Sequence, residues 1–491
     1  MRDIIFTFFN YFVFFYTSML AIFFVTFAFL SFISLKRRKD YYVESYMRKT
    51  IKESPYTPGI SVIAPAFNEE KTIIDNVNSM LALEYPLFEV VIVNDGSTDS
   101  TLEKMTEYYE LVEVPYAYIE RIKTRPFRRL LKSSNPKYSR LIVVDKENEG
   151  TKADASNAGI NVASHPYFIC TDVDCILEKY ALYRCISPII SSDKQVIAVS
   201  GTMLMANGCV VKDGQIIDVR TPRTPIPLFQ NLEYMRSYLI GKMGWSAING
   251  MPNVSGGFGL FDRSVAIAAG GYDAPSFAED MDLITRMVGY MCDFSRPYKI
   301  VQIPDTCCWT EGPPNLAMLY RQRTRWARGL FQTLNIHRKM IFKKTYKQMG
   351  LLTLPYMFVF EFLAPIIELV GLIVFIYLAF TGAVNWNTAW MIYLTIYTFC
   401  QLLSIVVITY DYYVGILYKR GYEYLWIIIA SILEPIFYHP IITFCSLRGY
   451  LSYLTNRDFK WKNMERKGFK QKEESVDDAD TTAMKPEPAT I

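Results

Sequence analysis

Long uncharged segments near both ends of the chain indicate a membrane protein. No charged residue occurs from Ile4 to Leu35, and the basic run of residues 36–39 follows at once. A bilayer core needs about 20 helical residues, so an apolar helix of this length accommodates one crossing but not two. We therefore expect residues 1–36 to form a single transmembrane signal anchor. Because basic residues favour the cytoplasmic side, the N-terminus should lie outside and the chain after Lys36 inside.

A second apolar block predicts further crossings toward the C-terminus. Residues 351–380 and 389–410 are good candidates for full spans. A third segment, 424–447, carries Glu434 and two prolines, and this composition fits an interfacial or re-entrant segment better than a lipid-facing span. The basic stretch that follows should be cytoplasmic, which requires an even number of crossings in this block. Two spans plus an interfacial third segment satisfy that requirement.

The middle of the chain has the pattern of an α/β domain. Short apolar runs at 60–65, 90–93, 141–145 and 167–171 alternate with polar, helix-like stretches at 69–83, 99–109 and 151–163. Continuous apolar runs are typical of parallel strands that are covered by helices on both faces. We therefore divide the chain into an N-terminal anchor (1–36), a cytoplasmic α/β domain (55–340), a C-terminal transmembrane region (350–450) and a tail that is basic and then acidic and partly disordered (451–491).

Composition excludes several functional classes. Of the 491 residues, 51% are hydrophobic and only 20% charged, which argues against a disordered chain and favours a membrane protein over an ordinary soluble enzyme. A net charge of +4 gives no reason to expect nucleic acid as a partner. Three scattered His residues leave little for a His-rich metal site or a His-based triad. Nine Cys without C-x-x-C spacing are expected to be reduced thiols.

Polar residues gather where the predicted strands end. The four strand ends carry Pro65–Glu69, Asn94–Asp95, Asp145–Lys146 and Asp172–Asp174. In parallel sheets, ligands bind outside the carboxyl ends of the strands. Asp95 and Asp99 could instead be turn and N-cap residues. Asp172 and Asp174 are harder to explain in this way, because two neighbouring carboxylates at a buried strand end need a cation, and a hard divalent ion with phosphate would supply it.

Later stretches each have an ordinary structural explanation when taken alone. Residues 150–157, which include Lys152, could be a solvated helix, and residues 255–259 could be a turn. The acids of 279–282 could mark a helix N-terminus. Residues 322–326 could belong to an amphipathic helix beside the membrane, with snorkelling Arg and interfacial Trp. The combination of all these explanations, in this order along one chain, is much less plausible than any one of them.

The order of these elements resembles the processive, membrane-bound glycosyltransferases of family 2, which include the synthases of cellulose, chitin, hyaluronan and poly-N-acetylglucosamine. The matching elements are Pro65-Ala66-Phe67-Asn68-Glu69, Asn94-Asp95-Gly96-Ser97-Thr98-Asp99, Asp172-Val173-Asp174, Glu279-Asp280 and Gln322-Arg323-Thr324-Arg325-Trp326. The last is the Q-x-x-R-W pattern of the processive group. The resemblance covers roughly residues 55–340 and the flanking spans, and it points to bacterial enzymes of the poly-N-acetylglucosamine synthase type.

Three features depart from the usual pattern of that family. The stretch expected beside the phosphates reads Asn148-Glu149-Gly150-Thr151-Lys152 in place of G-G-K, and only one N-terminal span is present. Residues 121–140 contain eight Lys or Arg and no acid. Two interpretations of this basic stretch stay open, a site for anionic lipid headgroups and a solvated basic loop.

The resemblance implies a GT-A fold, that is, a Rossmann-like cytoplasmic catalytic domain inserted between transmembrane helices. It also implies a UDP-sugar donor and Mg²⁺ or Mn²⁺ as cofactor. Asp174, with help from Asp172, would hold the metal on the diphosphate. The residues implied to bind the donor are Pro65, Glu69, Asp95, Lys152, Asp172, Gln322 and Arg325.

The same resemblance assigns the acceptor side of the reaction. Asp280 would be the general base that removes the proton of the acceptor hydroxyl, with direct attack on the anomeric carbon and inversion to a β-linkage. Trp326 would stack under the acceptor sugar, and Gly257 would lie in the loop beside it. The chain would thus be a hexosyl or N-acetylhexosaminyl transferase.

The favoured function is processive, inverting transfer of a sugar from UDP-sugar to a growing β-linked polysaccharide at the cytoplasmic face of the cell membrane. Two alternatives stay open: a single transfer to a lipid acceptor such as a prenyl phosphate or glycolipid, and a non-catalytic membrane scaffold. The expected partners are the UDP-sugar, an oligosaccharide, polysaccharide or glycolipid acceptor, membrane lipid and accessory membrane or periplasmic subunits. Nucleic acid is not among them.

Overall fold

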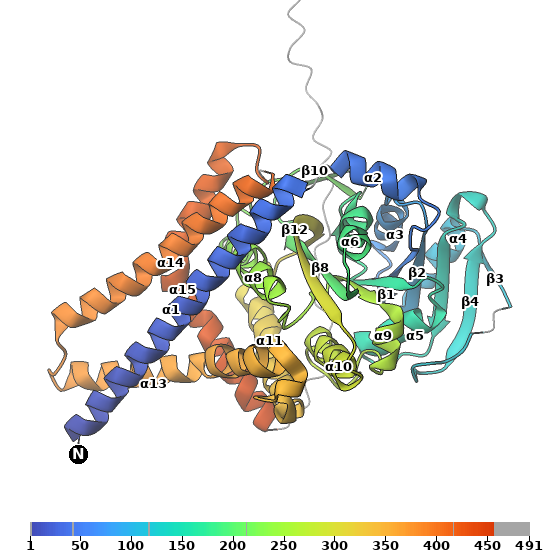
Figure 1. Cartoon of the computed structure of the whole chain (residues 1–491). Coiled ribbons are helices and arrows are strands. Elements are labelled where there is room, and N and C mark those ends of the chain that lie inside the picture. Colours follow the sequence, from blue (N-terminus) through green and yellow to red (C-terminus); the bar gives the residue numbers. More distant parts are fainter. Residues whose placement is uncertain (1, 42–43, 116–117, 213, 416, 456–491) are drawn as a thin grey trace, which may run out of the picture.

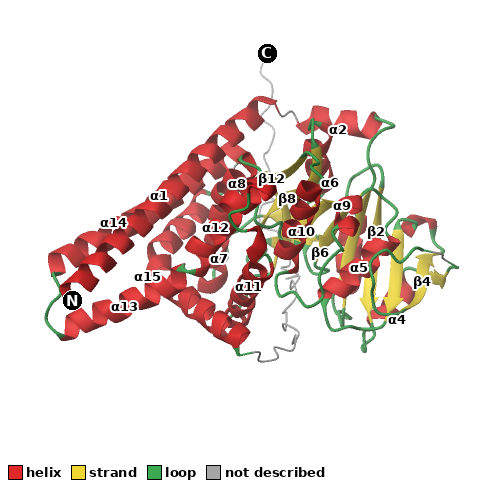
Figure 2. Cartoon of the chain, turned by 60° about the horizontal axis from the view of Figure 1, so that its bottom comes forward, coloured by secondary structure: helices red, strands yellow, loops and turns green. Residues whose placement is uncertain are grey.

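An α/β domain and a group of long helices beside it make up the structure (Figure 1). The computed structural model describes residues 2–41, 44–115, 118–212, 214–415 and 417–455. The expectations for the acidic end of the tail therefore lie outside the described residues. Figure 2 shows the same two parts from another side, with the strands gathered at one end of the molecule and the longest helices at the other.

The centre of the domain is a ten-stranded mixed sheet in the order β3-β4-β5-β2-β1-β6-β11-β8-β12-β7. The strands are β1 (Ile60–Ala66), β2 (Phe88–Asp95), β3 (Leu111–Glu113), β4 (Phe127–Ser133), β5 (Leu141–Lys146), β6 (Tyr167–Thr171), β7 (Ile176–Leu177), β8 (Gln195–Met205), β11 (Phe258–Asp262) and β12 (Tyr298–Thr310). A separate ribbon pairs β9 (Val210–Lys212) with β10 (Gln215–Asp218). The four predicted strand runs fall within β1, β2, β5 and β6.

Strands β5, β2, β1 and β6 pair in parallel, as the apolar runs predicted. Every residue of β2 and β5 is buried, so helices and loops cover both faces of this part of the sheet. Strand β11 runs antiparallel to both β6 and β8, and this makes the sheet mixed. The predicted α/β, Rossmann-like fold is therefore confirmed.

The three helix-like stretches of the sequence, 69–83, 99–109 and 151–163, contain α3 (Ile73–Leu81), α4 (Thr101–Tyr108) and α5 (Lys152–Val162). The other helices of the domain are α2 (Glu44–Glu53), α6 (Ala181–Ile190), α7 (Pro225–Arg236), α8 (Met243–Ala247), α9 (Arg263–Ala268), α10 (Glu279–Asp293) and α11 (Leu316–Ile336). A π-helical turn, η2 (Ser237–Lys242), joins α7 to α8. Short 3-10 turns lie at η1 (Pro136–Tyr138), η3 (Arg338–Met340) and η4 (Lys344–Tyr346).

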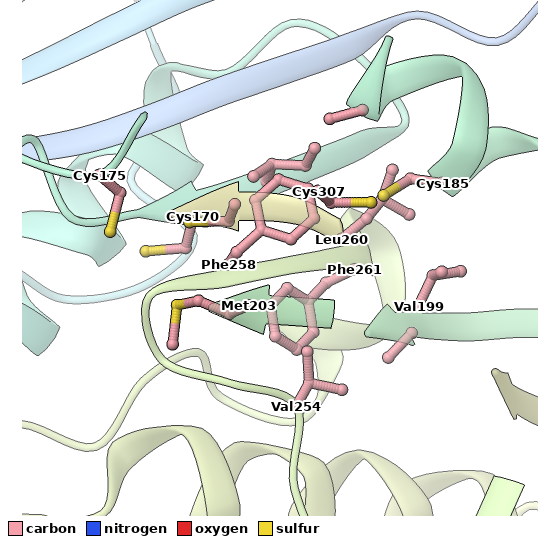
Figure 3. Packing of buried hydrophobic residues seen from close by; sticks show 14 of the residues in the cluster. Cys170, Cys175, Cys185, Val199, Met203, Val254, Phe258, Leu260, Phe261 and Cys307 are labelled. Carbon is pink, nitrogen blue, oxygen red and sulfur yellow. The ribbon is translucent and has the colours of Figure 1, made fainter. Parts of the chain in front are cut away.

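The hydrophobic core is continuous around strand β11. Figure 3 shows Phe258 and Phe261 of β11 beside Val199 and Met203 of β8, together with the thiol of Cys307. All nine cysteines are free, and most of them are buried. The reduced state of the thiols stays a prediction. The side chain of Met203 lies in this core and also lines the cavity described below.

Among the residues that the structure describes, four helices are long and apolar enough to cross a membrane, which supports a membrane protein. Helix α1 (Arg2–Tyr41) is one uninterrupted helix, as expected for a single anchor. The C-terminal ones are α13 (Ala364–Phe380), α14 (Trp386–Val414) and α15 (Gly421–Leu454). Ahead of α13, residues 349–362 form the turns η5 (Met349–Thr353), α12 (Leu354–Tyr356) and η6 (Met357–Phe362).

Helix α15 differs from the other long helices, because both of its ends contact the α/β domain. Near its start, Glu423 accepts hydrogen bonds from the backbone N–H of Thr221 (3.0 Å) and from Arg223 Nη2 (3.0 Å). Near its end, Tyr453 Oη accepts one from Asn335 Nδ2 (3.1 Å). The joined ends of α13 and α14 instead lie away from the domain (Figure 1), although α14 also packs against α7 and η2. By length α15 is a fourth candidate span. Its contacts with the domain at both ends instead favour a helix that lies at the membrane interface, and this stays a prediction.

The basic stretch 121–140 is only partly a loop. Residues 127–133 form strand β4, which pairs with β5 near one edge of the sheet, and Arg129 Nε donates to Asp145 Oδ2 over 3.1 Å. Most of the basic side chains are exposed, as the interpretation of a solvated basic stretch expects, although the middle of the stretch is a strand. In Figure 1 this edge lies at the opposite end of the molecule from α13 and α14, so the position of β4 gives no support to binding of lipid headgroups around those helices.

Candidate active site

A cavity of about 570 Å³ lies between the α/β domain and the membrane helices. The domain contributes the carboxyl ends of β6 and β8, the loop before β11, and faces of α7, α10 and α11. The membrane side contributes Glu361 from η6 and Ile442, Ser446 and Tyr450 from α15. Among the residues expected from sequence, those that line this cavity are Lys152, Asp172, Gly257, Asp280, Gln322, Arg325 and Trp326.

Lys152 and Asp172 form an ion pair at one end of the cavity. Lys152 Nζ lies 2.6 Å from Asp172 Oδ1 and donates a hydrogen bond to the carbonyl of Gly256 (2.6 Å). Burial alone would lower the pKa of Lys152, but the charge of Asp172 outweighs it and raises that pKa, so the lysine stays protonated. Lys152 is the first residue of α5, whose N-cap Thr151 accepts from the backbone N–H of Asp154. This cap fixes the direction in which the lysine leaves the helix.

Asp172 and Asp174 provide the donor set that a hard divalent cation needs. One carboxylate oxygen of each lies within 4.8 Å of the other and of Cys175 Sγ. Mg²⁺ and Mn²⁺ prefer carboxylate oxygens, whereas the buried thiol of Cys175 is a soft ligand. Both acids follow β6 directly, at the carboxyl end of a parallel strand. The residues present therefore fit a divalent metal held through the two carboxylates.

Gly257 lets the loop before β11 pass close to Asp172. A Cβ atom at this position would lie 3.0 Å from Met203 Sδ and 3.5 Å from Asp172 Oδ2. The carbonyl oxygen of Gly257 accepts a hydrogen bond from Thr171 Oγ1 (2.9 Å), which holds the loop against the end of β6. A Cβ here would thus make an ordinary contact with Asp172 but would require the flexible side chain of Met203 to shift by a few tenths of an ångström.

Three carboxylates at the start of α10 have different surroundings. Asp280 lines the cavity, and its Oδ1 accepts the backbone N–H of Met281 (2.8 Å). Glu279 also reaches the cavity, and burial raises its pKa although Arg325 opposes this. Asp282 lies outside the cavity. Burial would raise the pKa of Asp282, but hydrogen bonds from His337 (2.8 Å) and Arg286 (2.7 Å) lower it.

The Q-x-x-R-W pattern lies on α11 and presents three side chains to the cavity. Gln322 Oε1 accepts from Gln230 Nε2 (3.1 Å), and Arg325 Nη1 donates to the carbonyl of Phe277 (3.3 Å). Trp326 lies beside the guanidinium of Arg323, whose Cζ is 4.4 Å from the ring centroid. Helical spacing places these residues on one face, because positions three and four apart are neighbours.

Arg323 is a supporting residue that the sequence did not single out. It is buried and binds both oxygens of Glu233, with N–O distances of 2.6 and 2.5 Å. Arg323 Nη2 also donates to Tyr438 Oη (2.9 Å) on α15. A planar guanidinium is suited to this forked contact and to stacking on an aromatic ring. Arg323 thus holds Trp326, α7 and α15 together.

Replacing Arg323 by methionine should destabilise the protein by about 2 kcal/mol, because Glu233, whose side chain is 32% exposed, loses two charge-assisted hydrogen bonds and keeps the one from Tyr438. The thermal unfolding midpoint in detergent measures this loss. Arg321→Met is the matched control, since Arg321 is an exposed arginine two residues away. Equal midpoints for the two variants would contradict the supporting role of Arg323.

The sequence also failed to single out the wall formed by α7 and η2. Gln230, Glu233, Tyr234, Tyr238 and Lys242 of this segment all line the cavity. No short motif marks them, because their partners lie far away in the sequence. The sequence offered one indication of this wall: Glu233 and Lys242 are charged residues within a largely apolar stretch.

Pro65, Glu69, Asp95 and Asp174 do not line the cavity. Pro65 lies near the end of β1, and Glu69 follows in the loop before α3, where it accepts from Thr72 Oγ1 (3.1 Å). Asp95 ends β2 and pairs with Lys146 Nζ over 2.7 Å. Burial raises the pKa of Asp95, and the hydrogen bond from Lys146 only partly offsets this.

Lys146 is enclosed between two carboxylates at this strand end. It is only 1% exposed, and its Nζ also lies 2.6 Å from Asp154 Oδ2.

Asp99 has the turn role that its local sequence allowed, since its two oxygens accept the backbone N–H groups of Glu70 (3.2 Å) and Thr101 (3.0 Å). The local structural explanation therefore holds for Asp99, whereas Asp95 takes part in a buried charge cluster.

Two family models match most of the chain. Residues 61–204 match the model described as glycosyl transferase family 2, and residues 223–444 match glycosyl transferase family group 2.

Similar curated proteins include poly-β-1,6-N-acetyl-D-glucosamine synthases. The one from Staphylococcus aureus (strain COL) is 29% identical over 278 residues, which is 56% of this chain and 55% of the relative. The one from Staphylococcus epidermidis is 28% identical over 282 residues, 57% of each. The chain thus spans little more than half the length of these relatives.

Solved structures with some likeness are also glycosyltransferases. A mannosyltransferase from Pyrobaculum calidifontis, in complex with GDP-mannose and Mn²⁺, is 17% identical, with a TM-score of 0.48 over 88% of this chain and 100% of that one. Glucosyl-3-phosphoglycerate synthase from Mycobacterium tuberculosis, in complex with Mn²⁺, UDP and glucosyl-3-phosphoglycerate, is 13% identical, with a TM-score of 0.34 over 60% and 85%.

Proposed function

We propose that this chain, a member of glycosyltransferase family 2, transfers a sugar from a UDP-sugar to the growing end of a β-linked polysaccharide. The observation that carries the proposal is the single cavity in which Lys152, Asp172, Asp280 and Trp326 face one another. N-Acetylglucosamine is the first sugar to consider, because the curated relatives named above are poly-N-acetylglucosamine synthases.

The donor end of the cavity suits a nucleoside diphosphate. In our proposal Asp174 and Asp172 hold Mg²⁺ or Mn²⁺, which when bound offsets the negative charge that grows on the leaving diphosphate. Lys152 adds a fixed positive charge on the same side. Arg325 and Gln322 close over the phosphates from α11.

The uridine would lie beyond the phosphates, toward the ends of β1 and β2. Pro65, Glu69 and Asp95 are the residues that we assign to it, and they lie at the same edge of the sheet as Asp172. Because Lys146 binds Asp95 in this structure, the base would meet a carboxylate whose position is already fixed. Such pre-organisation lowers the entropy cost of binding.

The acceptor end of the cavity suits attack by a sugar hydroxyl. Asp280 would take the proton from the acceptor oxygen as that oxygen bonds to the anomeric carbon. The bond from that carbon to the diphosphate breaks on the opposite face, and UDP leaves with the electron pair. Trp326 provides an apolar surface under the acceptor ring, beside Gly257 and its loop.

Membrane orientation is the next part of the proposal. We place the α/β domain in the cytoplasm, where UDP-sugars are found, with the N-terminus outside and α13 and α14 crossing as a pair. Helix α15 then lies along the membrane surface, which agrees with its contacts to the domain at both ends. The basic end of the chain returns to the cytoplasm.

Cysteine labelling of intact cells should reveal this orientation. Ser54→Cys lies before β1 and should react with a membrane-impermeant maleimide only after permeabilisation. Thr381→Cys, between α13 and α14, should react in intact cells. The parent chain gives the background, which is expected to be low because most of the native thiols are buried. Labelling of Ser54→Cys in intact cells would overturn the orientation.

A single transfer to a lipid acceptor is the second candidate function. The observation that favours it is the apolar part of the cavity wall, where Ile442 and Tyr450 of α15 could admit a lipid-linked acceptor from the membrane. Membranes containing the protein should be incubated with a panel of UDP-sugars, and the products sized. A high-mass product supports the polysaccharide synthase, a one-sugar lipid product supports the alternative, and the absence of any transfer rejects both.

A further inference from the structure

Lys242 occupies an unusual position in the wall of the cavity. It closes the π-helical turn η2, a form of helix that is rare and often occurs at functional sites. Its side chain is only 8% exposed, and its ammonium lies 4.7 Å from the ring centroid of Tyr238. Both residues line the cavity.

The charge of Lys242 lacks a protein counter-ion. The other basic residues of the wall face acids: Lys152 pairs with Asp172, Arg323 with Glu233, and Arg325 lies 3.9 Å from Glu279. Within the part of the chain that the structure describes, no carboxylate lies within 4 Å of Lys242 Nζ. Burying an unpaired ammonium is costly, so a ligand is the natural source of the missing partner.

Asp280 is the carboxylate whose charge acts on Lys242. Burial lowers the pKa of Lys242 to about 8, and the carboxylate of Asp280 opposes this by raising it. Both side chains line the same cavity. Because the proposed function assigns Asp280 to the acceptor, Lys242 is assigned to the acceptor as well. The remaining charged groups of the wall are Lys152, Asp172, Glu233, Glu279, Glu311, Arg323, Arg325 and Glu361.

We propose that Lys242 donates a hydrogen bond to the same acceptor hydroxyl oxygen that Asp280 deprotonates. This inference rests on the proposed transferase function and adds a catalytic residue to it. The hydroxyl proton passes to the Asp280 carboxylate, and the ammonium of Lys242 keeps its own protons. Its charge stabilises the negative charge that grows on the acceptor oxygen as the new glycosidic bond forms and the bond to UDP breaks.

Lys242→Met tests the inference, with Lys242→Arg and Lys194→Met as comparisons. Loss of one fixed donor to a developing oxyanion lowers kcat by roughly 10²–10³-fold, and we expect a fall of that size in Lys242→Met with the donor KM unchanged. Lys242→Arg should recover part of the rate, because it restores a cationic donor. Lys194 is exposed and does not line the cavity, so Lys194→Met should behave as wild type.

Two further measurements separate catalysis from a merely structural role. The protonated lysine is the active form, so wild-type kcat/KM for the acceptor, which reports pKa values of the free enzyme, should fall as the pH rises through about 8, and Lys242→Met should lack this limb. Its thermal unfolding midpoint should not fall, because an unpaired buried charge has been removed. Either a wild-type kcat in Lys242→Met or a loss of donor affinity equal to the loss of rate would overturn the role of Lys242. Neither result would affect the proposed transferase function. A wild-type protein that transfers no sugar from any UDP-sugar overturns the proposed function as well.

Discussion

Asp280→Asn should reduce sugar transfer by ~10²–10⁴-fold, the contribution typical of a general base, while the protein still binds UDP-sugar with nearly wild-type affinity. The reason is that our proposal assigns this carboxylate to the acceptor and the Lys152–Asp172 pair to the donor, and both line the same cavity. Titration calorimetry with UDP and a transfer assay on the same preparation separate the two quantities. Asp293→Asn, an exposed substitution at the other end of α10, is the matched control.

A proportional loss of UDP affinity and transfer in Asp280→Asn would show that this carboxylate serves the donor or the metal. Glu279 would then be the next candidate for the base, because it also reaches the cavity. Asp282 would not, since its oxygens are engaged by His337 and Arg286 outside the cavity.

Removal of the divalent metal should abolish transfer, and Asp174→Asn should do the same. The carboxylates of Asp172 and Asp174 lie close together at the end of β6, where the diphosphate needs a counter-charge that Lys152 alone does not provide. Binding of Mn²⁺, followed by electron paramagnetic resonance, should weaken in Asp174→Asn without any donor present. Asp193→Asn, on an exposed turn, should bind Mn²⁺ as wild type. Full turnover in excess chelator would refute the metal assignment.

The parts of the fold that the sequence predicted well depend on local patterns. The runs that became β1, β2, β5 and β6 are apolar on both faces, so they could be recognised without knowing their neighbours. The Q-x-x-R-W residues share one helix face for the same local reason. Asp172 and Asp174 could be recognised from the sequence because residues that directly follow a parallel strand lie at its carboxyl end, where ligands bind.

The parts that the sequence did not predict depend on contacts between distant residues. Glu233 meets Arg323 only because α7 and α11 both pack against α15, and no spacing within either helix indicates the pair. Strand β4 was hidden by its composition, because Arg and Lys surround the two buried leucines Leu130 and Leu131. Lys242 could be recognised as special only after the cavity, its burial and the distances to other charges were known.

The mixed origin of the cavity wall matters for anyone who wishes to purify the catalytic part by itself. Glu361, Ile442, Ser446 and Tyr450 come from segments beyond residue 340, and Tyr438 of α15 donates to Glu233 (3.0 Å), which also lines the cavity. A fragment ending at residue 340 would lose this wall and open the cavity to bulk water. A preparation with an intact cavity therefore has to keep these helices, in detergent or nanodiscs.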